Sequence, residues 1–221
     1  MKNILIVSAT AFEIAPLLEY LKKNFIEHEP FHFQKGEKSV AVLITGVGLP
    51  LTAYAMGKVL ATKRYDLAIN AGIAGAFNRE LPIGEVVELI SERFGDLGVE
   101  EADGSFTDIH TLGLIDPNQT PFQNGILQNP NPGNFLPTVK GFSVNKVHGF
   151  EPNIEAIRQR FPADVETMEG AAFFYACLIE NQKFLAIRAI SNYVESRNRE
   201  NWNIPLAIEN LNEIILEISK Y

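Results

Sequence analysis

Residues Asn3 to Asn24 have the sequence NILIVSATAFEIAPLLEYLKKN, and this segment indicates the fold class. Its first part, NILIVSA, is apolar at consecutive positions, which is typical of a strand buried on both faces between two layers of helices. Its second part, from Ala11 to Asn24, has the spacing of apolar residues that belongs to a helix. The stretch therefore predicts one strand followed by one helix, the unit from which α/β folds are built.

The same alternation recurs along the chain. SVAVLITG precedes the helical pattern LPLTAYAMGKVLATKRY, DLAINAG precedes a glycine-rich turn, and FLAIRAISN precedes the C-terminal pattern IPLAIENLNEIILEISKY. We therefore predict a single domain over residues 1–221, with three α/β/α layers and a central mixed, largely parallel sheet. Active sites of such folds lie at the carboxyl ends of the strands.

One segment, at about 95–137, interrupts this rhythm. It contains GDLGVEEADGSF and DPNQTPFQNGILQNPNPGNFLP, which are rich in Gly, Pro, Asn and Gln. A loop of this length within a compact domain is usually functional or mobile. We interpret it as a long excursion from the domain rather than a linker, either serving a neighbouring subunit's pocket or covering the sheet.

Composition excludes several classes of protein. The chain has 221 residues, 46% of them hydrophobic, and a formal charge of -8, and its basic residues occur only in short groups. Nucleic-acid binding requires clustered Lys and Arg, so nucleic acid is not an expected partner. No apolar run approaches the roughly 20 residues of a membrane span, so we expect a cytoplasmic protein with no membrane partner. Cys177, the one cysteine, lies among apolar residues and is interpreted as a buried structural thiol.

Cofactor motifs are missing from the glycine-rich segments. In TGVGLP the third glycine of a dinucleotide fingerprint would fall at Leu51, and NAGIAGAF lacks the required spacing. No phosphate-loop motif or zinc motif is present, and the histidines share no ligand spacing. The histidines are His28, His32, His110 and His148. We therefore expect no metal and no organic cofactor, while the glycines either make tight turns or let a flat ligand lie against the backbone.

Three polar residues follow predicted strands in apolar surroundings. Glu13 follows the first strand, Glu169 follows the short run DVET, and Asn192 closes FLAIRAISN. Each has an ordinary alternative role: the glutamates as acidic residues in the first turn of a helix, and the asparagine as a cap or turn residue. If the sheet forms as predicted, the three side chains converge on one site.

These residues lie in motifs that resemble those of a family, the purine nucleoside phosphorylase and nucleosidase superfamily. The resemblance runs from end to end and rests on five motifs in the family's order. They are SATAFEIAPL (8–17), TGVG (45–48), NAGIAGAF (70–77), VETMEGAAFFYAC (165–177) and IRAISN (187–192). The resemblance implies that Glu169 binds ribose hydroxyls and that Met168 packs against the sugar. It also implies a small-molecule nucleoside substrate, homo-oligomers, and a pocket lined by residues of these motifs, among them Val47, Ile73 and Gly75.

The segment after the first strand favours the hydrolytic branch. Phosphorylases usually carry a Gly-Asp-Pro and arginine loop there, where this chain has SATAFEIAPL. In the hydrolytic branch, a glutamate at the position of Glu13 activates water. Breaking an N-glycosidic bond also requires help for the leaving base. Nucleosidases for methylthioadenosine and adenosylhomocysteine use an aspartate where this chain has Asn192. An amide suits a 6-oxopurine such as hypoxanthine better than adenine, although an asparagine can also pair with N7 and the 6-amino group of adenine.

The segment ISNYVESRNRENW is similar to the futalosine hydrolases, which release hypoxanthine from futalosine in the alternative menaquinone route. Futalosine carries a carboxylate, and Arg197 or Arg199 is expected to bind it, unless Glu195 and Glu200 pair with these arginines in a solvated loop. Phe150, which follows the predicted strand SVNKVHG, matches a position that lines the purine or sugar pocket in relatives, with core packing as the alternative.

Two other functions remain open. They are a methylthioadenosine/adenosylhomocysteine nucleosidase, and an inert nucleoside-binding protein on the same fold. Arg188 lies in the IRAISN motif, but it can equally pair with a buried carboxylate, so we do not include it in the predicted catalytic set.

Overall fold

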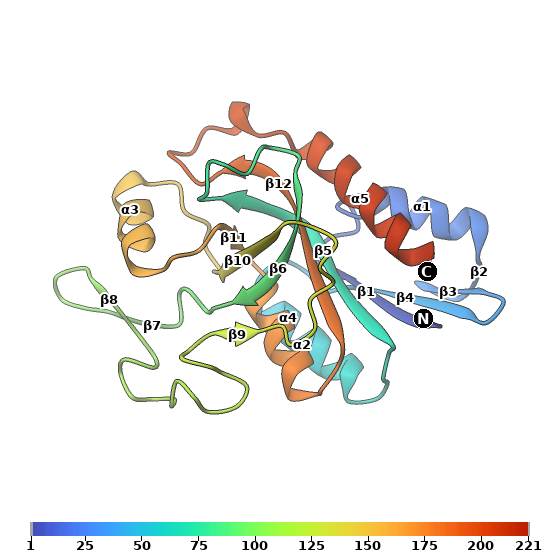
Figure 1. Ribbon diagram of the computed structural model, residues 1–221, viewed down its shortest axis with the longest axis horizontal. Coiled ribbons are helices and arrows are strands. Elements are labelled where there is room, and N and C mark those ends of the chain that lie inside the picture. The colour runs from blue at the N-terminus through green and yellow to red at the C-terminus, as the bar shows by residue number, and fades with distance from the viewer. Residues whose placement is uncertain (1, 221) are drawn as a thin grey trace.

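The first predicted strand is β1 (Asn3–Ser8), and it lies near the centre of the sheet (Figure 1). The structure is a computed structural model and describes residues 2–220. The remaining elements are, in chain order, α1 (Ala15–Asn24), β2 (Ile26–Glu29), β3 (His32–Lys35), β4 (Lys38–Ile44), α2 (Leu49–Leu60), β5 (Leu67–Ala76), β6 (Val86–Glu92), β7 (Gly98–Glu100), β8 (Phe106–Asp108), β9 (Leu127–Gln128), β10 (Thr138–Ser143), α3 (Glu151–Arg160), β11 (Val165–Thr167), α4 (Gly170–Ile179), β12 (Phe184–Tyr193), a 3-10 turn (Arg199–Asn201) and α5 (Ile204–Lys220). The predicted helix end at Tyr221 lies outside the described residues.

The main sheet has the order β11-β10-β6-β12-β5-β1-β4-β3-β2. β1 pairs in parallel with β4 and β5, and β12 also pairs in parallel with β5. Antiparallel pairs occur at the β2–β3–β4 edge and where β6 meets β12. In addition, β11 pairs back onto β5, so that part of the sheet curls on itself. The predicted mixed sheet of an α/β fold is confirmed.

Two helical layers cover the sheet, and the alternation of side chains along β1 explains why. Ile4 and Ile6 are buried in one hydrophobic cluster with α1 and α5, while Leu5 and Val7 are buried in another with α2 and α4. Figure 1 shows α1 and α5 on one side of the strands and α2 and α4 on the other. A strand that is apolar on both faces therefore stabilises both layers, as the sequence predicts. None of the helices within residues 2–220 combines the length and apolar character that a bilayer crossing requires.

The structure corrects two expected boundaries. The glycine-rich segment after DLAINAG is not a turn, because β5 continues through it to Ala76. Small residues there let β5 pair with both β12 and β11. The segment SVNKVHG is not a strand, because β10 ends at Ser143 and the chain turns before α3 begins at Glu151.

The segment 95–137 departs from the main layers. It contains the β7–β8 hairpin and then β9, which pairs antiparallel with β6. In Figure 1 it extends as a long green-to-yellow excursion on one side of the sheet. It therefore contributes a strand to the main sheet as well as forming surface loops.

Candidate active site

A cavity of about 320 Å³ lies where β1, β5 and β12 end and α4 begins. This is the position expected from the rule that α/β sites form at the carboxyl ends of strands. Seven of the predicted site residues line it: Glu13, Val47, Ile73, Gly75, Met168, Glu169 and Asn192. The fold thus brings together side chains from all five sequence motifs.

Glu13 is held in the turn between β1 and α1. Its Oε2 accepts hydrogen bonds from the Thr10 backbone N–H at 3.1 Å and the Thr10 hydroxyl at 2.9 Å. Its Oε1 accepts one from the Ile73 backbone N–H at 3.2 Å. Only 9% of Glu13 is exposed, and these donors fix the direction of the carboxylate. Thr10 is a site residue that the sequence reasoning missed, although an S/T-x-x-E pattern marks it.

A second anchor for Glu13 comes from the far end of the chain. The buried Asn212 on α5 donates from Nδ2 to the Glu13 carbonyl at 2.8 Å and accepts from the Leu17 backbone N–H at 3.1 Å. It thereby satisfies a backbone N–H at the start of α1 that has no partner within the helix. Asn212 lies among apolar residues of an amphipathic helix, and a polar residue at such a position is the sequence feature that could have indicated a buried hydrogen-bonding role.

Glu169 is the residue that precedes α4. Its Oε1 accepts a hydrogen bond from the Gly48 backbone N–H at 2.9 Å. Burial raises the pKa of Glu169, and the nearby Glu13 carboxylate raises it further, while Arg188 and the Gly48 N–H act in the opposite direction. The carboxylates of Glu13 and Glu169 are therefore close enough to repel each other electrostatically.

Asn192 lies at an irregularity in the pairing of β12 with β5. Its Oδ1 accepts a hydrogen bond from the Ser191 hydroxyl at 2.8 Å, and its Nδ2 donates to the Tyr193 carbonyl at 2.9 Å. These contacts orient the amide and use one of its two N–H donors. Gly75 leaves the space beside Nδ2 open, because a Cβ there would lie 3.1 Å from it.

Arg188 lies beneath the site rather than in an ion pair. It is 1% exposed and donates to the Asn70 carbonyl at 3.1 Å and to the Asn70 side-chain oxygen at 2.5 Å. Within residues 2–220 no carboxylate oxygen lies in salt-bridge range of it, so the alternative of a buried carboxylate partner is wrong. Its charge nevertheless lowers the pKa of Glu169 against the effect of burial.

Three predicted residues do not line this cavity. Phe150 is 63% exposed and directly precedes α3. Arg197 and Arg199 both lie over the ring of Trp202, at 5.2 and 5.9 Å from its centroid. Trp202 itself lines the cavity, so the arginines are one side chain away from it.

Glu195, one of the two carboxylates considered as partners of these arginines, has other contacts. Glu195 pairs with Arg79 at 2.6 Å and also accepts from Asn201. The expected pairing of Glu195 with Arg197 or Arg199 is therefore wrong.

Apolar side chains complete the cavity, and the sequence reasoning did not identify them. They are Phe12 between β1 and α1, Val147 between β10 and α3, and Trp202 and Ile204 just before and at the start of α5. Aromatic residues such as Phe12 and Trp202 in loops next to polar motifs were the available signal.

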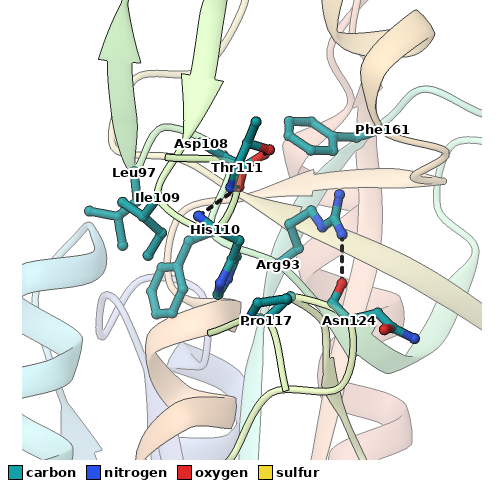
Figure 2. Close-up of a pocket in the computed structure, with 11 residues that line it drawn as sticks. Arg93, Leu97, Asp108, Ile109, His110, Thr111, Pro117, Asn124 and Phe161 are labelled. Atoms are coloured by element: carbon teal, nitrogen blue, oxygen red, sulfur yellow. Dashed lines mark hydrogen bonds between the residues drawn. The ribbon is translucent and has the colours of Figure 1, made fainter. Parts of the chain in front are cut away.

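A larger cavity of about 440 Å³ lies elsewhere, beside the 95–137 segment (Figure 2). Its charged groups are already engaged: Arg93 donates to the Asn124 carbonyl at 3.3 Å and lies over the Phe161 ring. Asp108 accepts from the backbone N–H groups of His110 and Thr111. None of the predicted site residues lines this cavity, so we assign the chemistry to the smaller one.

No metal-ligand group is indicated in the part of the chain that the structure describes, because its His, Cys, Asp and Glu side chains form no cluster that could hold an ion. Cys177 is buried in α4, and burial raises the pKa of its thiol well above the ordinary value. This agrees with a structural thiol.

Comparison with known proteins places this geometry in a family. The phosphorylase superfamily matches residues 3–122 and 138–220. The chain belongs to the phosphorylase superfamily. The unmatched residues, 123–137, fall within the 95–137 excursion.

Individual relatives agree with this assignment. A futalosine hydrolase from Acidothermus cellulolyticus is 32% identical over 77% of this chain and 71% of its own length. One from Thermus thermophilus is 30% identical over 86% of this chain and 88% of its own. The crystal structure of a 5'-methylthioadenosine/S-adenosylhomocysteine nucleosidase from Colwellia psychrerythraea, in complex with adenine, has a TM-score of 0.77 at 21% identity, covering 100% of this chain and 96% of that one. The predicted resemblance to the superfamily and to the futalosine hydrolases is confirmed.

Proposed function

We propose that this protein is a nucleosidase that hydrolyses the N-glycosidic bond of futalosine, releasing hypoxanthine and the dehypoxanthinyl sugar. The observation that carries this proposal is that Glu13, Glu169 and Asn192 line one cavity in a chain about 30% identical to futalosine hydrolases. We extend the proposal to a role in the alternative menaquinone route. The predicted cytoplasmic location stays a prediction.

Glu13 is the proposed general base. As the bond between the sugar C1 and the purine nitrogen breaks, its electron pair leaves with the base and positive charge develops on the sugar. Water attacks C1, and Glu13 takes the proton from that water, leaving a hydroxyl on the sugar. The hydrogen bonds from Thr10 and Ile73 keep the Glu13 carboxylate in one orientation for this transfer.

Glu169 and Met168 are the proposed ribose contacts. A carboxylate can accept hydrogen bonds from two hydroxyls, and the Glu169 Oε1 that Gly48 engages still has a free lone pair. Both glutamates place negative charge near the sugar, which favours the cationic transition state over the neutral substrate.

Asn192 is the proposed partner of the leaving base. One Nδ2 hydrogen is bound to the Tyr193 carbonyl, which leaves the other for the purine. An amide cannot act as an acid at neutral pH, so it stabilises the departing base by hydrogen bonding. A 6-oxopurine gains most from such a donor, which favours hypoxanthine over adenine and places the methylthioadenosine/adenosylhomocysteine nucleosidase second.

Arg197 and Arg199 remain the proposed partners of the substrate carboxylate. Their position over Trp202, which lines the cavity, supports a role at its mouth. Replacing both by Gln should raise KM for futalosine but not for a methyl ester of the same substrate. Equal effects on both substrates would contradict this role.

We propose a homo-oligomer that uses the face formed by α2 and α4. An apolar groove of about 420 Å³ lies there, lined by residues that include Pro50, Ala53, Ala172, Tyr175 and Ile179. Tyr175 and Ile179 are 40% and 44% exposed in the single chain, and burial of such side chains favours association. Light scattering after size exclusion should give a dimer or larger species, and Ile179→Asp should shift it toward the monomer.

The proposed function is tested by chromatographic detection of the free base. The purified protein is incubated with futalosine, aminodeoxyfutalosine, methylthioadenosine, adenosylhomocysteine and inosine, each with and without phosphate. Release of hypoxanthine from futalosine independent of phosphate is the expected result. Adenine release from methylthioadenosine would instead support the second nucleosidase, and binding without release of any base would support the inert binder.

A further inference from the structure

A buried polar cluster lies directly behind the proposed ribose-binding residues. It consists of Glu92 at the end of β6, Ser143 at the end of β10 and Thr167 at the end of β11, and we call it the Glu92 cluster. All three residues are buried, with Glu92 and Ser143 fully so. The cluster takes no part in the mechanism derived above, yet it contains a carboxyl group removed from solvent.

The three side chains form a closed ring of short contacts. Thr167 Oγ1 lies 2.9 Å from Glu92 Oε1, Ser143 Oγ lies 2.8 Å from Glu92 Oε2, and the two hydroxyl oxygens lie 2.7 Å apart. Each contact is of hydrogen-bond length and needs one hydrogen. The two hydroxyls supply only two hydrogens, so an ionised Glu92 would leave one contact with two facing oxygens and no hydrogen.

A third hydrogen on Glu92 satisfies every contact. With the proton on Oε1, Glu92 donates to Thr167, Thr167 donates to Ser143, and Ser143 donates to Glu92 Oε2. In this arrangement Oε2 stays an acceptor for the Arg93 backbone N–H at 3.3 Å, and Ser143 Oγ still accepts from the Ala171 backbone N–H at 2.8 Å. The geometry points to Glu92 as a protonated positioning residue, whose ring of hydrogen bonds fixes the connection between β11 and α4 in the active enzyme.

The connection between Thr167 and Ala171 contains Met168 and Glu169. Thr167 joins the ring through its hydroxyl, and Ala171 joins it through its N–H, so the segment is held at both ends. Ser143 thereby caps α4 from another strand, because Glu169 at the N-cap position makes no side-chain cap. The direction of Glu169 toward the cavity depends on these two anchors.

Two glycines, Gly170 and Gly141, leave the space that the Glu92 carboxyl occupies. A Cβ at Gly170 would lie 1.8 Å from Glu92 Oε1, and a Cβ at Gly141 would lie 2.5 Å from the same atom. Any other residue at position 170 would collide with the carboxyl. The sequence pattern M-E-G therefore has a second physical reason beyond access of the sugar.

Electrostatics agree with this protonation. Burial raises the pKa of Glu92 to about 7, against the opposing effects of the Ser143 and Thr167 hydroxyls, Arg188 and the Arg93 N–H. Among the described residues, Arg188 on β12 is the charged side chain that acts on Glu92, and its positive charge lowers the pKa of Glu92. β10, β11 and α4 present Ser143, Thr167 and the Ala171 N–H to it. Loss of the proton above neutral pH then opens the ring.

The first test is the pH dependence of kcat/KM in Glu92→Gln. Glutamine places an N–H donor where the proton of Oε1 lies and keeps it at every pH, so it mimics the protonated acid. This test rests on the proposed function, because it reads hydrolysis. We expect the wild-type kcat/KM to fall as pH rises above neutral, because Glu92 then loses its proton. At pH 6 the kcat/KM of the variant should lie within about threefold of wild type, and its decline at high pH should begin about one pH unit or more higher. A limb unchanged from wild type, or an equal loss at all pH values, would overturn the inference. Glu209→Gln on the exposed face of α5 is the control and should keep the wild-type profile.

The second test does not depend on activity or on the folding of that variant. Carbon-13 NMR of side-chain-labelled glutamate should show a carboxyl carbon in its protonated position at pH 6, titrating near pH 7 in the wild-type protein and still present in Glu169→Gln, whose carboxyl also has a raised pKa. Thr167→Ser keeps the hydroxyl and should retain this resonance, whereas Thr167→Val removes a member of the ring and should shift its midpoint. If all glutamates titrate in the ordinary range, the inference fails, even if futalosine is hydrolysed. If the resonance is found but no nucleoside is hydrolysed, the proposed function fails instead.

Discussion

The Gly48 backbone N–H donates a 2.9 Å hydrogen bond to the Glu169 carboxylate, although the two residues are 121 positions apart in the chain. Gly48 directly precedes α2, with φ of 101°, which lies in the region that favours glycine. The contact therefore joins the start of α2 to the start of α4 at the proposed ribose site. The hydrogen bond thus holds the turn at Gly48 and the buried Glu169 carboxylate in position relative to each other.

Glu13→Gln is expected to lower turnover by about 100-fold or more, because glutamine keeps the shape of the side chain but cannot take a proton from water. Steady-state hydrolysis of futalosine measures this. Glu19→Gln, on the exposed face of α1, is the matched control and should behave as wild type. Turnover of Glu13→Gln near that of the control would exclude Glu13 as the base.

Glu169 should give hydrolysis an acid limb at higher pH than an ordinary glutamate would. Burial raises its pKa, so its carboxylate, the form that accepts ribose hydroxyls, is lost earlier as pH falls. Glu169→Gln should lower kcat/KM by about tenfold or more and remove this limb. A pH profile that keeps the limb in the variant would contradict the assignment.

The Glu169 carboxyl should also affect the stability of the fold, but here the loss occurs as pH rises, whereas activity is lost as pH falls. A carboxyl whose pKa is raised by folding stabilises the protein fully below its unfolded pKa, and this contribution is lost as pH rises through the folded pKa. Glu169→Gln should therefore raise Tm relative to wild type at pH 8, with a smaller gain at pH 4. Thermal unfolding at both values checks this, with Glu213→Gln on the exposed face of α5 as control.

Asn192→Asp should shift preference toward 6-aminopurines. Nδ2 of Asn192 now donates to the Tyr193 carbonyl at 2.9 Å, and in the variant a carboxyl oxygen of the aspartate would take its place. Because this oxygen would face the carbonyl oxygen of Tyr193, the protonated form of the aspartate is favoured. A protonated aspartate can give its proton to the purine N7. The ratio of kcat/KM for aminodeoxyfutalosine to that for futalosine should rise by about tenfold. Asn153→Asp on the surface of α3 should leave the ratio unchanged, and an unchanged ratio in Asn192→Asp would refute the argument from the amide.

Gly72→Ala should lower kcat more than it changes KM. A Cβ there would lie 3.0 Å from Glu13 Oε1, so the carboxylate must shift by a few tenths of an ångström. Small displacements of a catalytic group are costly, and we expect a loss of about tenfold in kcat. Gly57→Ala on α2 is the control, since a Cβ there meets nothing within 4 Å in the single chain; because Gly57 also lines the groove proposed for association, the oligomeric state of this variant is measured alongside its kinetics. Equal kinetics in the two variants would show that Glu13 tolerates the shift.

The layered fold and most residues of the proposed site could be predicted from local sequence patterns. Alternating apolar runs predict the two helical layers, because a strand apolar on both faces must be covered twice, and Ile4 to Val7 show this directly. Glu13, Glu169 and Asn192 were predictable because each is a polar residue in a motif that ends a strand. Short-range patterns carry this information, since the carboxyl ends of parallel strands meet at one edge.

Contacts between groups far apart in the chain could not be predicted in this way. Asn212 contacts Glu13 across 199 positions, and Glu92 meets Thr167 across 75, with no local pattern to indicate either pair. Arg197 and Phe150 lie in segments that resemble the family's motifs, yet neither lines the cavity. Local periodicity fixes which face of an element is buried. Which buried polar groups satisfy one another depends on the packing of strands and helices far apart in the chain.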